Sequence, residues 1–211
     1  MSIPIYHITP LKNLTSILNS GGIMSYNRLR DAKIRPTNIA HEHIQDRRAN
    51  KLVPCSAGGV LNDYVPFYFA PRSPMLYSIH KGNVEGYTEG QSQVLHLVTT
   101  AETIDENSLA YAYTDGHAVM AYSDFFDDIE ALYDYPIIDW ELMESNYWFN
   151  TEDDPNRKCR RQAEFLVHQF FPWHLVTEIG VINPKIQAQV NTLLLKFVHK
   201  PKVTVRSNWY Y

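Results

Sequence analysis

Short apolar runs separated by turn residues predict a mixed α and β fold. Alternating or continuous apolar residues indicate strands at residues 3–8, 65–70, 94–99, 111–113, 163–168, 179–182 and 202–206. Leu14, Ile17 and Leu18 recur at helical spacing after Pro10, which suits a first helical turn, and Gly21 ends that helix. The chain is therefore expected to begin with a strand that runs directly into a helix.

Helical spacing is also clear near the end of the chain, where Ile186, Val190 and Leu194 lie in register. Helical segments are expected at residues 38–50, 75–80, 123–132, 184–196 and, in part, 137–150. Residues 25–37 are polar and basic without a clear period, so a loop is expected there. The 211 residues contain no repeat or linker, and this length suits one domain. We therefore predict a single α+β domain over residues 1–211.

One of the predicted strands carries a charged residue, Glu164, between apolar neighbours. Alternation places Glu164, Leu166 and His168 on one face of that strand, and Phe165 and Val167 on the other. A carboxylate that is buried without a partner is energetically costly. Glu164 is therefore paired with an arginine, exposed at a sheet edge or part of a cleft, and the residues alone leave these alternatives open.

Composition indicates an ordinary folded protein. Hydrophobic residues make up 45% and charged residues 20%, which is typical of globular rather than disordered chains. The two cysteines, Cys55 and Cys159, suit free thiols in a reducing compartment. No apolar run approaches the about 20 residues that span a membrane, and the start does not resemble a signal peptide. We expect a cytoplasmic protein without membrane contact.

The charges are unevenly distributed along the chain. The net charge is −4, which does not by itself indicate a nucleic-acid-binding protein. Residues 82–156 contain 17 of the 23 acidic residues and no lysine or arginine, whereas residues 157–161 read Arg-Lys-Cys-Arg-Arg. Such segregation can create one positive face on an acidic protein, but the charges alone favour ordinary solvated surfaces.

Several common catalytic motifs are missing from the sequence. His41-Glu42-His43 is the densest cluster of the nine histidines, but no H-E-x-x-H or C-x-x-C spacing occurs, so no metal is expected. Ser73 precedes a proline and has no G-x-S-x-G turn around it, which argues against a serine nucleophile. No P-loop or G-x-G-x-x-G motif is present, so a classical nucleotide site is not expected.

Two further histidines occupy positions that suit ligand binding. His7 lies where the first strand runs into a helix, whose free backbone N–H groups can bind polar ligand atoms. His117 lies in Thr114-Asp115-Gly116-His117, where a turn is expected. The alternatives, a core histidine at position 7 and an exposed loop histidine at position 117, remain open from the residues alone.

Six segments spread over almost the whole chain carry a resemblance to a known family. They are Ile5–Thr9 (IYHIT), His43–Arg48 (HIQDRR), Gly58–Tyr77 (GGVLNDYVPFYFAPRSPMLY), Thr114–His117 (TDGH), Gln162–Val167 (QAEFLV) and Trp209–Tyr211 (WYY). In this order they resemble the DarT family of DNA ADP-ribosyltransferase toxins, and the long central block is the most specific part.

The resemblance implies an ADP-ribosyltransferase fold, in which split central β-sheets surround an NAD+ cleft with helices outside. It implies an enzyme that uses NAD+ as co-substrate, without a metal, and transfers ADP-ribose to thymidine in single-stranded DNA within a short sequence motif, blocking replication. It also implies a toxin–antitoxin system with a macrodomain partner similar to DarG, and the toxin is expected to be a monomer. The alternatives are modification of guanine, RNA or protein by the same fold, and an inactive binding module.

The resemblance also implies roles for individual residues. Those implied to be catalytic are Glu164, Arg48 and His117. Those expected to bind NAD+ are His7, Ile8, Thr9, Ser16, Met24 and Arg48, and from its aromatic ring also Tyr68, which either stacks on nicotinamide or joins the core. Those expected to contact DNA are Met75 and His117, with Arg72, Arg157, Lys202 and Arg206 as candidate phosphate ligands.

The chemistry of these residue types fits such a reaction. Cleavage of the bond between nicotinamide and ribose develops positive charge on the sugar, which a carboxylate such as Glu164 stabilises. Arg48 stays protonated and can pair with the pyrophosphate, so it is poorly suited to act as a base. We hypothesise that Arg48 orients the substrates, while His117 or Glu164 takes the proton from the base.

Overall fold

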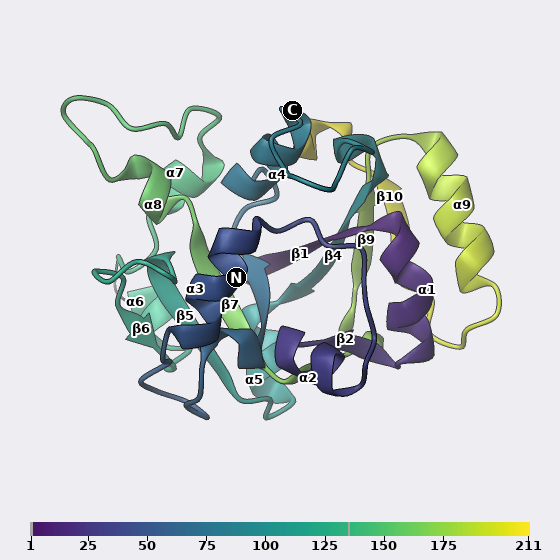
Figure 1. Cartoon of the computed structure of the whole chain (residues 1–211), viewed down its shortest axis with the longest axis horizontal. Coiled ribbons are helices and arrows are strands. Elements are labelled where there is room, and N and C mark those ends of the chain that lie inside the picture. The colour runs from purple at the N-terminus through teal and green to yellow at the C-terminus, as the bar shows by residue number, and fades with distance from the viewer. Residues whose placement is uncertain (1, 135) are drawn as a thin grey trace.

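The computed structural model describes residues 2–134 and 136–211, and an eight-stranded sheet forms its centre (Figure 1). The strand order is β10-β9-β4-β1-β3-β7-β5-β6. The strands are β1 (Pro4–Pro10), β3 (Tyr64–Tyr68), β4 (Val94–Thr100), β5 (Tyr111–His117), β6 (Phe125–Phe126), β7 (Ala163–His168), β9 (Glu178–Val181) and β10 (Lys202–Val205). A second sheet pairs β2 (Gly22–Met24) with β8 (Phe170–Pro172).

The large sheet is split between β1 and β3. β1 pairs with β4 along its whole length, from Pro4 opposite Thr100 to Pro10 opposite Val94. β3 likewise pairs with β7 along its whole length. Between β1 and β3, however, the ladder contains a single pair, Tyr6 opposite Tyr68. The expected split pair of sheets is therefore present, as two four-stranded halves that meet at one point.

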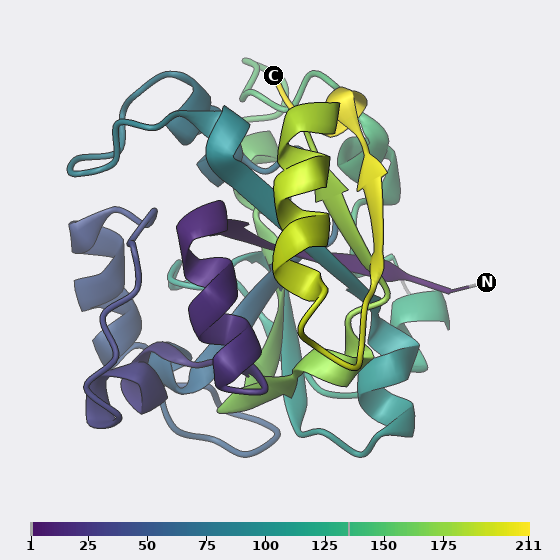
Figure 2. The ribbon, with the colours of Figure 1, turned by 90° about the vertical axis from the view of Figure 1, so that its right-hand side faces the viewer.

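Helices pack around this sheet. They are α1 (Leu11–Asn19), α2 (Tyr26–Asp31), α3 (Glu42–Asn50), α4 (Pro74–His80), α5 (Ala101–Glu106), α6 (Ala131–Asp134), α7 (Trp140–Glu144), α8 (Arg157–Arg160) and α9 (Pro184–Leu194). Figure 2 shows α1 and α9 side by side over one face of the sheet. Their apolar residues enter the main core there, including Leu14 from α1 and Val190 from α9. No helix in the described part of the chain is long and apolar enough to cross a membrane.

The alternation predicted around Glu164 is confirmed. Phe165 and Val167 belong to the main core and are fully buried. Leu166 points to the opposite face, where it packs in a separate cluster with Leu61 and Ala118. β7 is therefore covered on both faces, which explains why the strand reads as an almost continuous apolar run.

Several segments differ from the sequence-based expectation, among them residues 25–37 and 123–132. Helix α2 occupies part of the predicted loop 25–37, and the Ser25 side chain caps it by accepting the Arg28 N–H. The helix predicted over residues 123–132 is wrong, because Phe125 and Phe126 form the edge strand β6 against β5. Stacking of Phe126 on Tyr113, with ring centroids 5.4 Å apart, favours the strand over the helix that the apolar spacing indicated.

Position 117 also differs from expectation. His117 ends strand β5 instead of lying in a turn, although the register of β5 against β7 shifts between Tyr113 and His117. Gly116 precedes it, and a side chain at that position would bring Cβ to 2.9 Å from the Sγ atom of Cys159. The close approach of the strand to Cys159 therefore explains the glycine.

The end of the chain packs against β9 and β4. The Trp209 ring lies edge-on to Tyr6 and His96, with centroid separations of 5.2 and 5.5 Å. It also covers Gly180, where a methyl group would overlap Cζ3 of Trp209 and lie 2.6 Å from its Cε3 atom. The absence of a side chain at Gly180 is therefore what lets the ring reach the sheet.

We predict that Gly180→Ala lowers the free energy of unfolding by about 1–3 kcal/mol, the usual cost of overpacking. Urea denaturation measures this cost in the parent chain and again in a Trp209→Ala background. Because the overlap disappears with the ring, the substitution should cost less in the second background. An equal cost in both would contradict the packing explanation.

Candidate active site

A buried ion pair lies at the centre of the site. Arg48 Nη1 donates to Glu164 Oε2 at 2.7 Å, and the two residues are only 7% and 3% exposed. The other carboxylate oxygen, Oε1, accepts the Ala118 N–H at 3.3 Å, and Arg48 Nη2 donates to the Leu61 carbonyl at 3.4 Å. Glu164 is thus paired with an arginine, as one of the sequence-based alternatives proposed.

The sheet fixes the position of Glu164. On one side of β7, Glu164 lies opposite Tyr68 of β3, and on the other side Ala163 lies opposite His117 of β5. The Glu164 N–H also donates to Thr114 Oγ1 at 3.1 Å. A carboxylate on a strand that is paired on both edges has little freedom to move, which suits a preorganised catalytic group.

Helix α3 brings the arginine to this carboxylate. Arg47, next to Arg48, donates from Nη2 to the Val119 carbonyl at 3.0 Å, and Lys51 Nζ donates to the Met120 carbonyl at 2.9 Å. The C-terminal half of α3 is therefore tied to the loop that follows β5 as well as to Glu164.

A cavity of about 590 Å³ opens beside the ion pair. We call it the carboxylate cavity. Glu164, Arg48 and His117 all line it, so the structure brings together the three residues that the resemblance implied to be catalytic. Its lining also includes Tyr122 and three aromatic residues that pack on one another, Tyr77, Trp148 and Phe149, which we call the aromatic wall.

His117 can act as a proton acceptor in this cavity. Burial lowers the pKa of His117 from its usual value of 6.5, and the positive charge of Arg48 lowers it further, whereas Glu164 acts in the opposite direction. The imidazole is therefore neutral near pH 7, the form that accepts a proton.

A second cavity, of about 740 Å³, lies at the end of β1. We call it the strand-end cavity. Of the residues predicted to bind NAD+, those that line it are His7, Ile8, Thr9, Ser16, Met24 and Tyr68, whereas Arg48 lines the carboxylate cavity. Five residues line both cavities, namely Ala40, Gln45, Pro66, Tyr68 and Met75. The two cavities therefore meet beside the split between β1 and β3.

His7 bridges this split. Its Nδ1 lies 2.9 Å from the Pro66 carbonyl oxygen. A carbonyl can only accept, so Nδ1 carries the hydrogen and Nε2 is the acceptor nitrogen. Burial lowers the pKa of His7 to about 4, which keeps the ring neutral. Helix α1 starts next to it, and no side chain of the described residues caps its first turn, so its N–H groups remain available to an anion.

The arginines predicted to contact DNA all make contacts within the protein. Arg206 lies near the far end of the sheet, outside both cavities, and pairs with Glu178 at 2.7 Å. Arg72 donates to the Tyr210 carbonyl and to Asn146 Oδ1. Arg157 donates to the Tyr147 carbonyl at 2.7 Å. None of these three arginines lines either cavity, and Lys202 lies with Arg206 at β10, whereas Met75 lies where the cavities meet.

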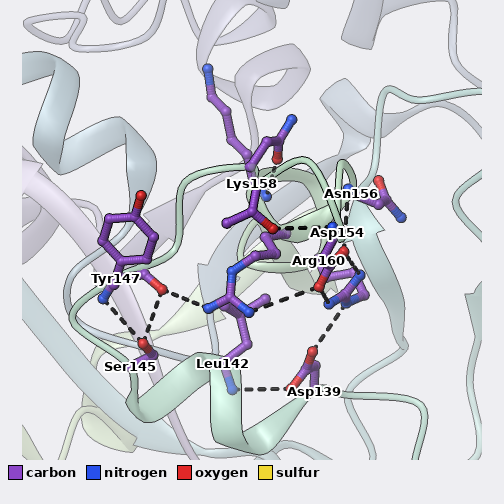
Figure 3. A network of polar contacts seen from close by, with 11 residues as sticks. Asp139, Leu142, Ser145, Tyr147, Asp154, Asn156, Lys158 and Arg160 are labelled. Carbon is purple, nitrogen blue, oxygen red and sulfur yellow. Dashed lines mark hydrogen bonds and ion pairs between the residues drawn. The ribbon is translucent and has the colours of Figure 1, made fainter.

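The neighbouring arginines organise the loop between α7 and β7. Figure 3 shows Arg160 between two carboxylates: its Nη2 lies 2.7 Å from Asp154 Oδ2, and its Nε lies 3.0 Å from Asp139 Oδ2. Arg161 is buried and donates to backbone carbonyls of Arg72, Met143 and Ser145. This loop carries Trp148 and Phe149, so the two arginines shape the aromatic wall of the carboxylate cavity.

Some residues of the site were not predicted from the sequence. Asn13 lines the strand-end cavity and Gln45 lines both cavities, but neither side chain type is distinctive. The aromatic wall had a signal, because residues 137–150 are rich in aromatics. The histidine pair His41 and His43 lines the carboxylate cavity, and no group of three or more metal-binding side chains gathers anywhere in the described chain.

Comparison with known proteins identifies similar chains. The family model described as "ssDNA thymidine ADP-ribosyltransferase, DarT" matches residues 6–211. The DNA ADP-ribosyl transferase of Thermus aquaticus is 45% identical and aligns over 98% of this chain and 88% of its own length. A Thermosipho africanus fusion of a DNA ADP-ribosyl transferase with a DNA ADP-ribosyl glycohydrolase is 26% identical over 88% of this chain and 44% of its own length.

Solved structures are similar over the whole chain. Thermus sp. 2.9 DarT in complex with ADP-ribosylated ssDNA superposes with a TM-score of 0.90 at 40% identity, covering 99% of this chain and 96% of that one. The same protein in complex with NAD+ gives a TM-score of 0.85 at 38% identity, covering 99% and 98% of the two chains.

We predict that Glu164→Gln destabilises the fold, because it leaves the buried Arg48 without a counter-charge. Breaking such a pair costs about 3–5 kcal/mol, and access of water through the cavity favours the lower end of this range. Adding Arg48→Met should recover part of the loss, since the unpaired charge is then removed. Urea denaturation of Glu164→Gln, of Arg48→Met and of the double variant provides the measurement.

Asp31→Asn, in the exposed pair between Asp31 and Arg30, provides the control and should change the stability little. Strictly additive effects of Glu164→Gln and Arg48→Met would show that the two buried charges do not stabilise each other.

Proposed function

The chain belongs to the DarT family of ssDNA thymidine ADP-ribosyltransferases, and from this premise we propose that it transfers ADP-ribose from NAD+ to a thymidine base of single-stranded DNA. One observation carries the proposal: two cavities meet beside a buried glutamate–arginine pair. A reaction between two large substrates needs such a junction, because the bond between nicotinamide and ribose and the attacking DNA base must lie next to each other there.

NAD+ would occupy the strand-end cavity. The relative from Thermus sp. 2.9 was solved in complex with NAD+. In this chain, the cavity offers the acceptor nitrogen of His7, the side chain of Thr9 and the free N–H groups at the start of α1, all suited to polar groups of a dinucleotide. Tyr68 and Met75 at the junction would then lie next to the nicotinamide ribose.

The target base would enter the carboxylate cavity. Glu164 would stabilise the positive charge that develops on the ribose as nicotinamide leaves. Arg48 holds the carboxylate in place, and its guanidinium can also donate to a phosphate or to a base carbonyl. His117, neutral near pH 7, would take the proton that the base loses.

The DNA would lie along the rim of the carboxylate cavity. Phe149 is 38% exposed and stacks on Trp148 with ring centroids 4.3 Å apart, which offers bases an aromatic surface. Arg72 and Arg157 remain proposed phosphate ligands, although each would have to exchange a protein contact for one to DNA. Arg206 and Lys202 lie in or next to β10, and a role for them would require a longer strand of DNA.

The biological setting follows by analogy with the relatives. The Thermosipho africanus relative joins a DNA ADP-ribosyl transferase to a DNA ADP-ribosyl glycohydrolase, an enzyme that would remove ADP-ribose from the DNA. We propose that this chain is likewise the toxin of a toxin–antitoxin pair, with a macrodomain antitoxin as partner, and that its modification blocks replication in the cytoplasm. We propose that it acts as a monomer.

Incubation with NAD+ and single-stranded oligonucleotides tests the activity. We expect mass spectrometry to detect an added ADP-ribose on oligonucleotides that contain thymidine, within a restricted sequence context. The same oligonucleotides with every thymidine replaced should stay unmodified, and Glu164→Ala should abolish the product, because the charge on the ribose loses its counter-charge.

Unmodified DNA together with intact NAD+ would overturn the proposal. An adduct on guanine, on RNA or on protein would instead favour the corresponding alternative within the same fold.

The pH dependence of the transfer tests His117. Because its pKa is lowered, the neutral imidazole persists below pH 6.5, and the rate should fall only at more acidic pH, where the ring gains its proton. In His117→Gln the rate should be lower, and this acidic limb should disappear. A pH–rate profile with the same acidic limb in both proteins would exclude His117 as the titrating group.

A further inference from the structure

One wall of the strand-end cavity is an irregular segment between α2 and α3. Residues 33–40, which we call the strap, all line this cavity. Figure 1 shows the strap passing in front of the junction of β1 and α1 on its way to α3. Most of the strap has no regular structure, so its position depends on individual contacts.

Asn13 makes the contacts that hold the strap. Its Oδ1 accepts the Thr37 N–H at 2.8 Å, and its Nδ2 donates to the Thr37 carbonyl at 2.9 Å. In residues 2–134 and 136–211, these are the two hydrogen bonds that join the strap to a distant element. The other hydrogen bonds of the strap are to residues near it in sequence. Asn13 is buried in the first turn of α1, so the tie has a rigid base.

The same side chain also orients Thr9. The second hydrogen of Nδ2 points to Thr9 Oγ1, at 3.2 Å. When a hydroxyl oxygen accepts in this way, its own hydrogen remains free to donate elsewhere. Thr9 lines the strand-end cavity, so a ligand there can receive that hydrogen bond.

We propose that Asn13 is a positioning residue for NAD+: its amide fastens the strap over the dinucleotide and turns the Thr9 hydroxyl into a donor toward it. This inference rests on the proposed function, because it assigns NAD+ to the strand-end cavity. It adds a residue that acts through its hydrogen bonds to Thr9 and Thr37.

Asn13→Asp provides a sharp test, because the side chain keeps its shape. The introduced carboxylate would still accept the Thr37 N–H, but it would repel the Thr37 carbonyl oxygen. It would also accept a hydrogen bond from the Thr9 hydroxyl, whose hydrogen is then no longer available to the ligand. We expect the Kd for NAD+, measured by calorimetry without DNA, to rise about tenfold or more, as the loss of one to two hydrogen bonds implies. Asn19→Asp, an exposed change in the same helix, adds the same charge and should bind like the parent chain.

Steady-state kinetics separates positioning from a purely structural role. A smaller folded fraction would lower kcat and leave the KM for NAD+ unchanged. We instead expect Asn13→Asp to raise the KM for NAD+, with kcat and the KM for the oligonucleotide close to those of the parent. Thr37→Pro removes the N–H group of the strap from the tie and leaves Asn13 unchanged, and it should raise the same KM if the aspartate variant fails to fold.

The two parts of the proposal can be distinguished in a Thr9→Val background. Valine has no hydroxyl, so in that background Asn13→Asp can no longer turn the hydroxyl hydrogen away from the ligand. Its effect on the Kd for NAD+ should therefore be smaller. An equal effect in both backgrounds would overturn the assignment to Thr9. NAD+ binding by Asn13→Asp as tight as by Asn19→Asp would overturn the proposal as a whole, whereas a parent chain that binds no NAD+ would contradict the proposed function itself.

Discussion

The buried charges of Arg48 and Glu164 must face each other, and much of the site is arranged around that requirement. The backbone at Glu164 has little freedom to move, because its strand is paired on both edges. The arginine must therefore come to it on α3, a polar helix of nine residues that would be marginal in isolation. Arg47 and Lys51 attach this helix to the loop after β5. The ion pair, the helix and the loop thus depend on one another, and the catalytic arrangement exists only in the folded chain.

The split in the sheet provides the space for a ligand. Backbone polar groups along a gap between strands need partners, or the gap would close or destabilise the fold. Pro66 reduces the problem because it has no N–H group, and its carbonyl accepts a hydrogen bond from His7 across the gap. The cavities can therefore meet at the split while the sheet remains continuous through Tyr6 and Tyr68.

The sequence predicted those elements whose pattern reflects local structure, such as the strand around Glu164 and the helix that contains Val190. It failed at Phe125 and Phe126, whose apolar spacing suggests a helix but whose partner is a distant strand. The pattern alone left the role of Glu164 open, and only the family resemblance joined it to Arg48 and His117. Asn13 was not predictable in this way, because its significance lies in bonds to a segment 24 residues away.

The basic residues 157–161 show how charge in a sequence can mislead. They suggest a positive surface for DNA, but Arg160 is paired with two aspartates and Arg161 is buried against backbone carbonyls. Lys158 remains exposed at the carboxylate cavity. Affinity from phosphate contacts grows with the number of cations that reach the backbone of the DNA. Because these two arginines are committed to the protein's own loop, they add little affinity through phosphate contacts, whereas the aromatic wall that they hold in place offers a surface on which bases can stack.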